Sequence, residues 1–172
     1  MKSLDDCLII ENFQISINRD FLKNKGFSVI LAYDLFRAVE ADWLVNAIKS
    51  ELTSSDRLLG YSFEKKEEFS KELIPIERDQ LLKYVQINSI HHSVLTNEQH
   101  NFLAYFSQHR DFYIIAGTSK FLNIANPVSP DTVKYQYFEN VSLEAQRMPV
   151  DEKYFHGLWE YYKANHFKGS DT

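Results

Sequence analysis

Cysteine, glycine and proline are scarce in this chain of 172 residues, and each shortage narrows the range of folds. Cys7 is the only cysteine, so the chain can form no intramolecular disulfide, and a structural zinc site is not expected. Five glycines and four prolines leave little room for long irregular segments, and no internal repeat or linker is visible. We therefore expect one domain, residues 1–172, in a reducing, cytoplasmic environment.

Long apolar runs and strong charge bias are also missing. Hydrophobic residues make up 44% of the chain and charged residues 25%, and the net charge is −5. No stretch approaches the roughly 18 apolar residues of a membrane span, and the N-terminal residues lack the apolar segment of a signal peptide. The basic cluster expected of a dedicated nucleic-acid binder is absent too. The composition predicts a soluble, mildly acidic globular protein with no membrane partner.

Apolar patterning predicts strands that alternate with helices. Residues 27–33 form a continuous apolar run, which is typical of a strand buried on both faces. Apolar residues then recur at helical spacing over residues 35–52. A second apolar run, residues 112–116, leads through Gly117 into a short capped helix. The clearest helical stripe of the chain begins at Tyr154.

The middle of the chain is interpreted as a parallel strand–helix–strand unit. Residues 84–87 are predicted as its first strand and residues 112–116 as its second. Between them, Thr96 and Gln99 have the spacing of a capping box, which predicts a helix over residues 97–109. This order favours an α/β fold with a parallel or mixed sheet of about four to six strands and packed helices.

Weaker patterns suggest the remaining elements. They predict short strands at residues 8–10, 13–17, 57–63 and 133–141, and a charged helix within residues 64–79. The segment after Asn18 fits either a short helix that ends at Gly26 or a long hairpin loop.

Polar side chains follow three of the predicted strands, which gives a first functional hypothesis. Asp34, the pair His91 and His92, and the pair Thr118 and Ser119 would converge if those strands were parallel neighbours. The protein would then be a small enzyme acting on a phosphorylated or nucleotide substrate. Asp34 would supply an acid, His91 or His92 the general acid/base, and Thr118 and Ser119 the anion site. The alternative is that all five are ordinary turn and cap residues.

Motifs with stronger catalytic meaning are missing. The chain has no Walker spacing, no G-x-G-x-x-G, no H-E-x-x-H and no G-x-S-x-G, so no cofactor and no metal site is predicted. Cys7 lies beside Asp5 and Asp6, whose charge disfavours a reactive thiolate.

Aromatic residues crowd the final third of the chain and give a second hypothesis. Tyr135 and Tyr137 share one face of the strand predicted at residues 133–141, and Tyr161 falls outside the last helical stripe. Exposed tyrosines are frequent in interface hot spots, although tyrosine is also tolerated half-exposed in α/β proteins. The sequence thus favours a non-catalytic protein-binding module, of the kind of an immunity or antitoxin-type inhibitor. A basic, nuclease-like toxic protein would be the matching partner.

Overall fold

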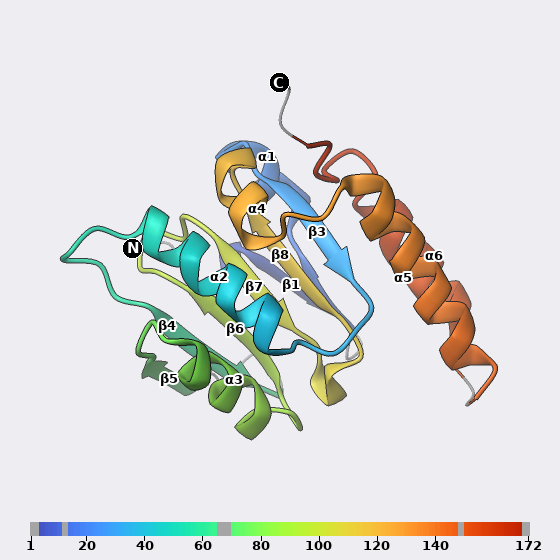
Figure 1. Ribbon diagram of the computed structural model, residues 1–172, viewed down its shortest axis with the longest axis horizontal. Helices are drawn as coiled ribbons and strands as arrows, with labels where there is room; N and C mark the ends of the chain where they lie inside the picture. Colours follow the sequence, from blue (N-terminus) through green and yellow to red (C-terminus); the bar gives the residue numbers. More distant parts are fainter. Residues whose placement is uncertain (1–3, 12–13, 65–69, 148–149, 170–172) are drawn as a thin grey trace.

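The computed structural model describes residues 4–11, 14–64, 70–147 and 150–169. Its strands are β1 (Leu8–Glu11), β2 (Gln14–Ile17), β3 (Ser28–Ala32), β4 (Leu59–Phe63), β5 (Ser70–Leu73), β6 (His92–Thr96), β7 (Leu103–Phe106) and β8 (Tyr113–Gly117). Its α-helices are α1 (Arg19–Lys25), α2 (Ala38–Glu51), α3 (Arg78–Ile87), α4 (Ser119–Ala125), α5 (Pro130–Ala145) and α6 (Glu152–Tyr161). Together they form an α/β fold (Figure 1).

A six-stranded sheet in the order β3-β8-β7-β6-β4-β5 lies between two hydrophobic cores. Successive residues of β3 alternate between them: Val29 and Leu31 face one core and Ile30 the other. Helices α2, α3 and α4 cover the second face, whereas the separate β1–β2 hairpin, α1 and α6 pack on the first. Helix α5 runs beside the outer strand β3 (Figure 1).

The sheet is antiparallel, so the prediction of a parallel or mixed sheet was wrong. Every neighbouring pair within the six strands that the structure describes is antiparallel. Strands β6, β7 and β8 follow one another through short connections, which suit antiparallel neighbours because a parallel connection needs a crossover of a dozen or more residues. The strands expected at residues 27–33 and 112–116 exist as β3 and β8, but they run in opposite directions.

The helix predicted over residues 97–109 is instead the hairpin of β6 and β7. The Thr96 hydroxyl donates to the carbonyl oxygen of Phe102 at 2.5 Å, and the Asn97 side chain accepts the N–H of Asn101 at 2.8 Å. Polar groups with capping-box spacing therefore close a turn. Residues 102–106 are all buried on both faces of the sheet, which is a strand environment.

Two segments that were predicted as strands are helical. Residues 84–87, predicted as a strand, belong to helix α3, and residues 133–141, also predicted as a strand, lie within helix α5. The Ser129 side chain accepts the N–H of Thr132, and Pro130 occupies the first turn, so the apparent loop signal at Ser129-Pro130 is a helix start.

Other local signals are confirmed. Asn18 and Thr118 cap α1 and α4 through their side chains, and Asp151 caps α6. Gly26 ends α1 at φ 65°, a left-handed conformation that suits glycine. The charged helix predicted within residues 64–79 is contradicted where the structure describes the chain, because residues 70–73 form β5, while residues 65–69 lie outside the described ranges.

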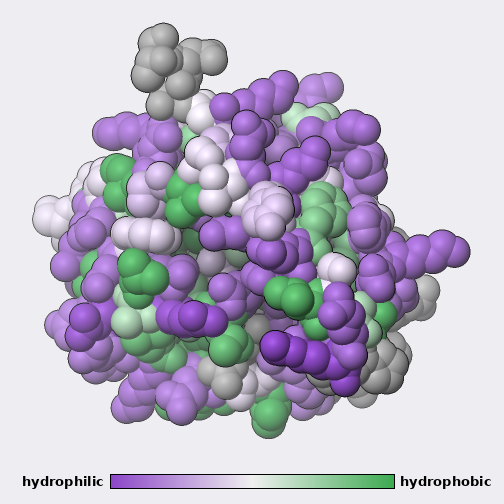
Figure 2. Space-filling model, turned by 45° about the vertical axis from the view of Figure 1, so that its right-hand side comes forward, coloured by the Kyte–Doolittle hydropathy of each residue, from purple (hydrophilic) through white to green (hydrophobic). Residues whose placement is uncertain are grey.

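Helices α5 and α6 form the side of the molecule that is brought forward in Figure 2. That side is mostly hydrophilic, with small separate hydrophobic patches (Figure 2). Among the helices of the described ranges, none combines the length and the apolar character that crossing a membrane requires.

Candidate functional site

An open cleft of about 600 Å³ lies where the end of β3 meets the loop before β8, the C-terminal half of α5 and the start of α6. We call it the acidic cleft. Its lining residues are Tyr33, Asp34, Leu35, Arg37, His109, Asp111, Asn140, Leu143, Glu144, Arg147, Val150, Asp151 and Phe155.

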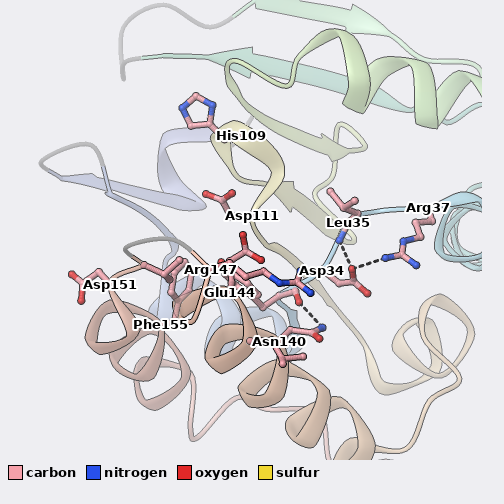
Figure 3. A pocket seen from close by; sticks show the side chains of 13 residues that line it. Asp34, Leu35, Arg37, His109, Asp111, Asn140, Glu144, Arg147, Asp151 and Phe155 are labelled. Carbon is pink, nitrogen blue, oxygen red and sulfur yellow. Dashed lines mark hydrogen bonds and ion pairs between the residues drawn. The ribbon is translucent and has the colours of Figure 1, made fainter.

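Four carboxylates from four separate segments surround this cleft: Asp34, Asp111, Glu144 and Asp151 (Figure 3). Arg37 and Arg147 also line it, so acids outnumber arginines by two. Asp34 is held in place because its carboxylate accepts the N–H of Leu35 at 2.7 Å and pairs with the Arg37 guanidinium at 3.2 Å. No ion pair is found for Asp111, Glu144 or Asp151 within the part of the chain that the structure describes.

Electrostatics within the cleft favour added positive charge. Burial raises the pKa of the Asp111 carboxyl, His109 opposes this shift, and Glu144 adds to it. Burial also raises the pKa of the Tyr33 hydroxyl to about 12, and the negative charges of Asp111 and Glu144 contribute. Glu144 is therefore close enough to disfavour the ionised form of Asp111. A cation placed between them would relieve this repulsion.

The wall of the cleft is aromatic and firmly positioned. The ring of Tyr33 meets that of Phe155 edge to face, with centroids 4.7 Å apart. The Asn140 side chain donates to the carbonyl oxygen of Tyr33 at 2.9 Å, which ties α5 to the end of β3. An apolar wall beside carboxylates suits the long side chain of lysine or arginine, whose stem is apolar and whose end is charged.

The loop that carries His109 has a strained backbone. His109 adopts φ 66° and ψ 0°, a left-handed conformation that non-glycine residues rarely take. Its N–H donates to the carbonyl oxygen of Ser89 at 2.8 Å, which holds the loop in this shape. Strained residues of this kind are concentrated at functional sites.

A shallow apolar groove on the outer surface of α5 adjoins the acidic cleft. We call it the α5 groove. Tyr135 is 64% exposed and Leu143 is 44% exposed, while Phe138 is half-buried between them. Leu143 lines both the groove and the acidic cleft, so the two features form one continuous surface.

The structure brings only part of the predicted strand-end site together. Asp34 and His92 lie at the same end of the sheet, after β3 and at the start of β6. Thr118 and Ser119 follow β8, which runs antiparallel to β3, so they lie at the opposite end. Thr118 acts as the cap of α4 and accepts the N–H of Phe121 at 3.2 Å. The five residues do not converge.

The two predicted histidines differ in environment. His92 is buried, its Nδ1 lies 2.9 Å from the Tyr105 hydroxyl, and the N–H of Gln108 donates to the same atom. Burial lowers the pKa of His92 to about 4, with smaller contributions from His109 and His91. His91 is half-buried, with Nδ1 3.3 Å from a carboxylate oxygen of Glu64. His92 is therefore a neutral core residue of this end of the sheet.

The three predicted interface tyrosines also lie in different environments. Tyr135 is exposed and donates its hydroxyl hydrogen to Glu139 at 3.0 Å. Tyr137 is 1% exposed and donates to the carbonyl oxygen of Phe155, so it belongs to the core. A strand would have put both on one face, whereas residues two apart on a helix point in different directions. Tyr161 is half-buried, with the Arg19 guanidinium 4.6 Å from its ring centroid.

Most cleft residues carried no signal in the sequence. Asp111 falls between the helix predicted over residues 97–109 and the strand predicted over residues 112–116, and Glu144 and Arg147 follow a segment that was predicted as a strand. Only the three-dimensional arrangement shows that the end of α5 brings Glu144 and Arg147 to the same cleft as Asp34. Within the described residues, no group of three or more His, Cys, Asp and Glu side chains is arranged to hold a metal ion.

Comparison with known proteins adds no assignment. No protein family model, no curated protein and no solved structure matches the chain.

Proposed function

We propose that the protein is a non-catalytic protein-binding module that recognises a basic partner through the acidic cleft. The observation that carries the proposal is the gathering of Asp111, Glu144 and Asp151, without ion-pair partners among the described residues, around an aromatic wall. A lysine or arginine side chain of a partner would neutralise these carboxylates and cover the rings of Tyr33 and Phe155.

The α5 groove supplies the apolar part of the same surface. Protein interfaces combine an apolar centre, often aromatic, with a polar rim. Tyr135 and Phe138 would form that centre, and the acidic cleft would steer the partner by its charge. The net charge of −5 acts in the same direction, because opposite charges accelerate association.

The form of this function that we favour is neutralisation of a toxic protein, as in immunity or antitoxin-type inhibitors. A nuclease must carry a basic surface to hold nucleic acid, so an acidic surface of this kind can cover its active site. The proposal places Tyr135, and not the buried Tyr137, in the interface.

The test uses two variants that change net charge equally. Asp111→Lys/Glu144→Lys reverses charge in the acidic cleft. The control, Glu72→Lys/Glu98→Lys, reverses two exposed acids elsewhere. Tagged wild-type protein and both variants are purified from the native cells of the protein, and co-eluting proteins are identified by mass spectrometry.

We expect one near-stoichiometric basic partner with the wild type and the control, and its loss with the cleft variant. With that partner purified, the association rate should fall steeply as salt concentration rises. A nuclease partner should lose activity when the wild type is added and keep it when the cleft variant is added. Recovery of the partner by both variants alike would reject the acidic cleft as the binding site.

The alternative function, a small enzyme for phosphorylated or nucleotide substrates, has lost the convergence on which it depended. His91→Ala distinguishes the two functions, because only the enzyme hypothesis assigns a role to the histidine pair. This substitution removes the half-buried histidine of the former catalytic pair without disturbing the core, so the protein-binding function predicts unchanged partner capture.

A further inference from the structure

A second cleft, of about 410 Å³, lies at the opposite end of the α5–α6 pair. Its walls come from the start of α5, the end of α6 and the C-terminal segment at residues 166–168, and its floor is the edge of β3. We call it the lysine cleft. Its lining residues are Val29, Ile30, Leu31, Pro130, Asp131, Val133, Lys134, Trp159, Glu160, Lys163, His166, Phe167 and Lys168.

Positive charge dominates this cleft although the chain as a whole is acidic. Three lysines line it against two acids. Lys163 is engaged, because its ammonium group pairs with Glu160 at 3.0 Å. For Lys134 and Lys168 no ion pair occurs among the residues that the structure describes, so both ammonium groups can meet an anion.

One wall of the lysine cleft is a flat aromatic stack. The rings of Trp159 and His166 lie 4.0 Å apart, with planes inclined by 26°. The Nε2 of His166 lies 3.0 Å from the carbonyl oxygen of Trp159 and donates its hydrogen to it, which fixes the orientation of the imidazole. Burial lowers the pKa of His166, whereas its hydrogen bond to Trp159 and the charge of Glu160 raise it and Lys134 lowers it. Because Trp159 is only 9% exposed, the stack meets the cleft mainly through the ring of His166.

The floor of the cleft contains unpaired backbone groups. Val29 donates its N–H to the carbonyl oxygen of Asn165 and accepts the N–H of Phe167, both on the side away from β8. Alternate residues of a strand direct their backbone groups to the same side. The N–H and C=O of Leu31 therefore also point away from β8. Leu31 is fully buried, yet its N–H and C=O find no partner in the described parts of the chain.

Buried backbone groups without partners are rare, because each lost hydrogen bond destabilises the fold. Leu31 is 0% exposed, so a ligand in the cleft does not reach its N–H. Lys134 and Lys168 provide two positive charges beside an aromatic wall. The volume lies within the usual range of small-molecule sites.

We propose that the lysine cleft binds a small organic anion, a carboxylate or a phosphate carried on a flat apolar body. The anionic group meets the ammonium groups of Lys134 and Lys168. The flat body lies against the Trp159–His166 stack. This site lies at the opposite end of α5 from the acidic cleft, and it shares Asp131 and Lys134 with the α5 groove.

Trp159 makes the proposal testable by fluorescence. The chain has two tryptophans, and Trp43→Phe on α2 leaves Trp159 as the only reporter. This variant is titrated with benzoate and phenyl phosphate, which carry the two anionic groups on one apolar ring. Benzamide, which is uncharged, and inorganic phosphate, which lacks the ring, serve as controls.

We expect a saturable change of Trp159 fluorescence with benzoate or phenyl phosphate, at a dissociation constant of about 1 mM, as suits ligands of this size. Comparing the two anions tells a carboxylate site from a phosphate site. Benzamide and inorganic phosphate should bind at least about tenfold more weakly. Lys134→Glu/Lys168→Glu should abolish binding, and the equally charged control Lys49→Glu/Lys83→Glu should keep it.

Two results would overturn the proposal. One is the absence of a saturable signal with both aromatic anions, and the other is equal binding by the two lysine variants. Thermal unfolding of each variant checks that it is folded, and Lys134→Gln/Lys168→Gln replaces the charge reversal if that variant unfolds early. Equal affinity for inorganic phosphate and phenyl phosphate would reject the role of the aromatic stack.

Discussion

The hydroxyl of Tyr162 should contribute measurably to stability, because it holds the β1–β2 hairpin against α6. The N–H of Ile17, at the end of β2, donates to this hydroxyl at 2.7 Å, and both residues are 0% exposed. Tyr162→Phe keeps the ring in the core but leaves the Ile17 N–H buried without a partner. Such a loss destabilises a fold by about 1–3 kcal/mol. For a chain of this size, the melting temperature should fall by about 3–10 °C.

Tyr161→Phe is the matched control, because Tyr161 is the last residue of α6 and directly precedes Tyr162. Tyr161 is half-buried, and in the described part of the chain its hydroxyl forms no hydrogen bond. The free energy of unfolding of this variant should stay within about 0.5 kcal/mol of the wild type. Urea unfolding of the three proteins at pH 7 measures both effects. Equal stability of the two variants would contradict the role assigned to the Tyr162 hydroxyl.

Two further predictions concern the end of the sheet that borders the acidic cleft. His92 has a pKa of about 4 in the folded protein, below the value of about 6.5 for an unfolded histidine, so the unfolded chain takes up its proton first as pH falls. The free energy of unfolding should therefore drop by about 2 kcal/mol between pH 7.5 and 5. Urea unfolding should show a smaller drop for His92→Gln. An unchanged pH dependence in that variant would refute the assignment of the drop to His92. His109→Gly should raise the free energy of unfolding by about 0.5–1 kcal/mol, because glycine adopts the left-handed conformation freely. His109→Ala should not raise it. Equal stabilisation by both variants would show that the positive φ of His109 is not the cause.

Local signals predicted the elements whose environment is uniform along their length. The apolar run that became β3 and the stripe that became α6 each match one periodicity, and each begins or ends at a cap or turn residue. The run at residues 102–106 was harder, because Phe102, Leu103 and Phe106 also fit a helix face. Its register only becomes clear beside β6 and β8, where every one of its side chains is buried.

The direction of the sheet could not be predicted, because it depends on how strands are connected. Once residues 97–109 were interpreted as a helix, the strand before it and the strand after it had to be parallel. The interpretation of Thr96 and Gln99 as a capping box decided this outcome. In the structure the side chains of Thr96 and Asn97 close a turn, because polar side chains of this kind serve turns as well as helix caps. The predicted strand-end site failed to assemble for the same reason.

The acidic cleft and the lysine cleft share α5, and this explains why α5 has no clear apolar stripe. Tyr137 and Val141 are its only fully buried side chains among the described residues, and they fix it to the core. Its remaining faces border two clefts of opposite charge, one near Lys134 and the other near Glu144. A helix with such mixed surroundings gives a weak periodic signal, which is why its sequence resembles a half-exposed strand. The element that sequence patterns described worst is therefore the element on which both proposals depend.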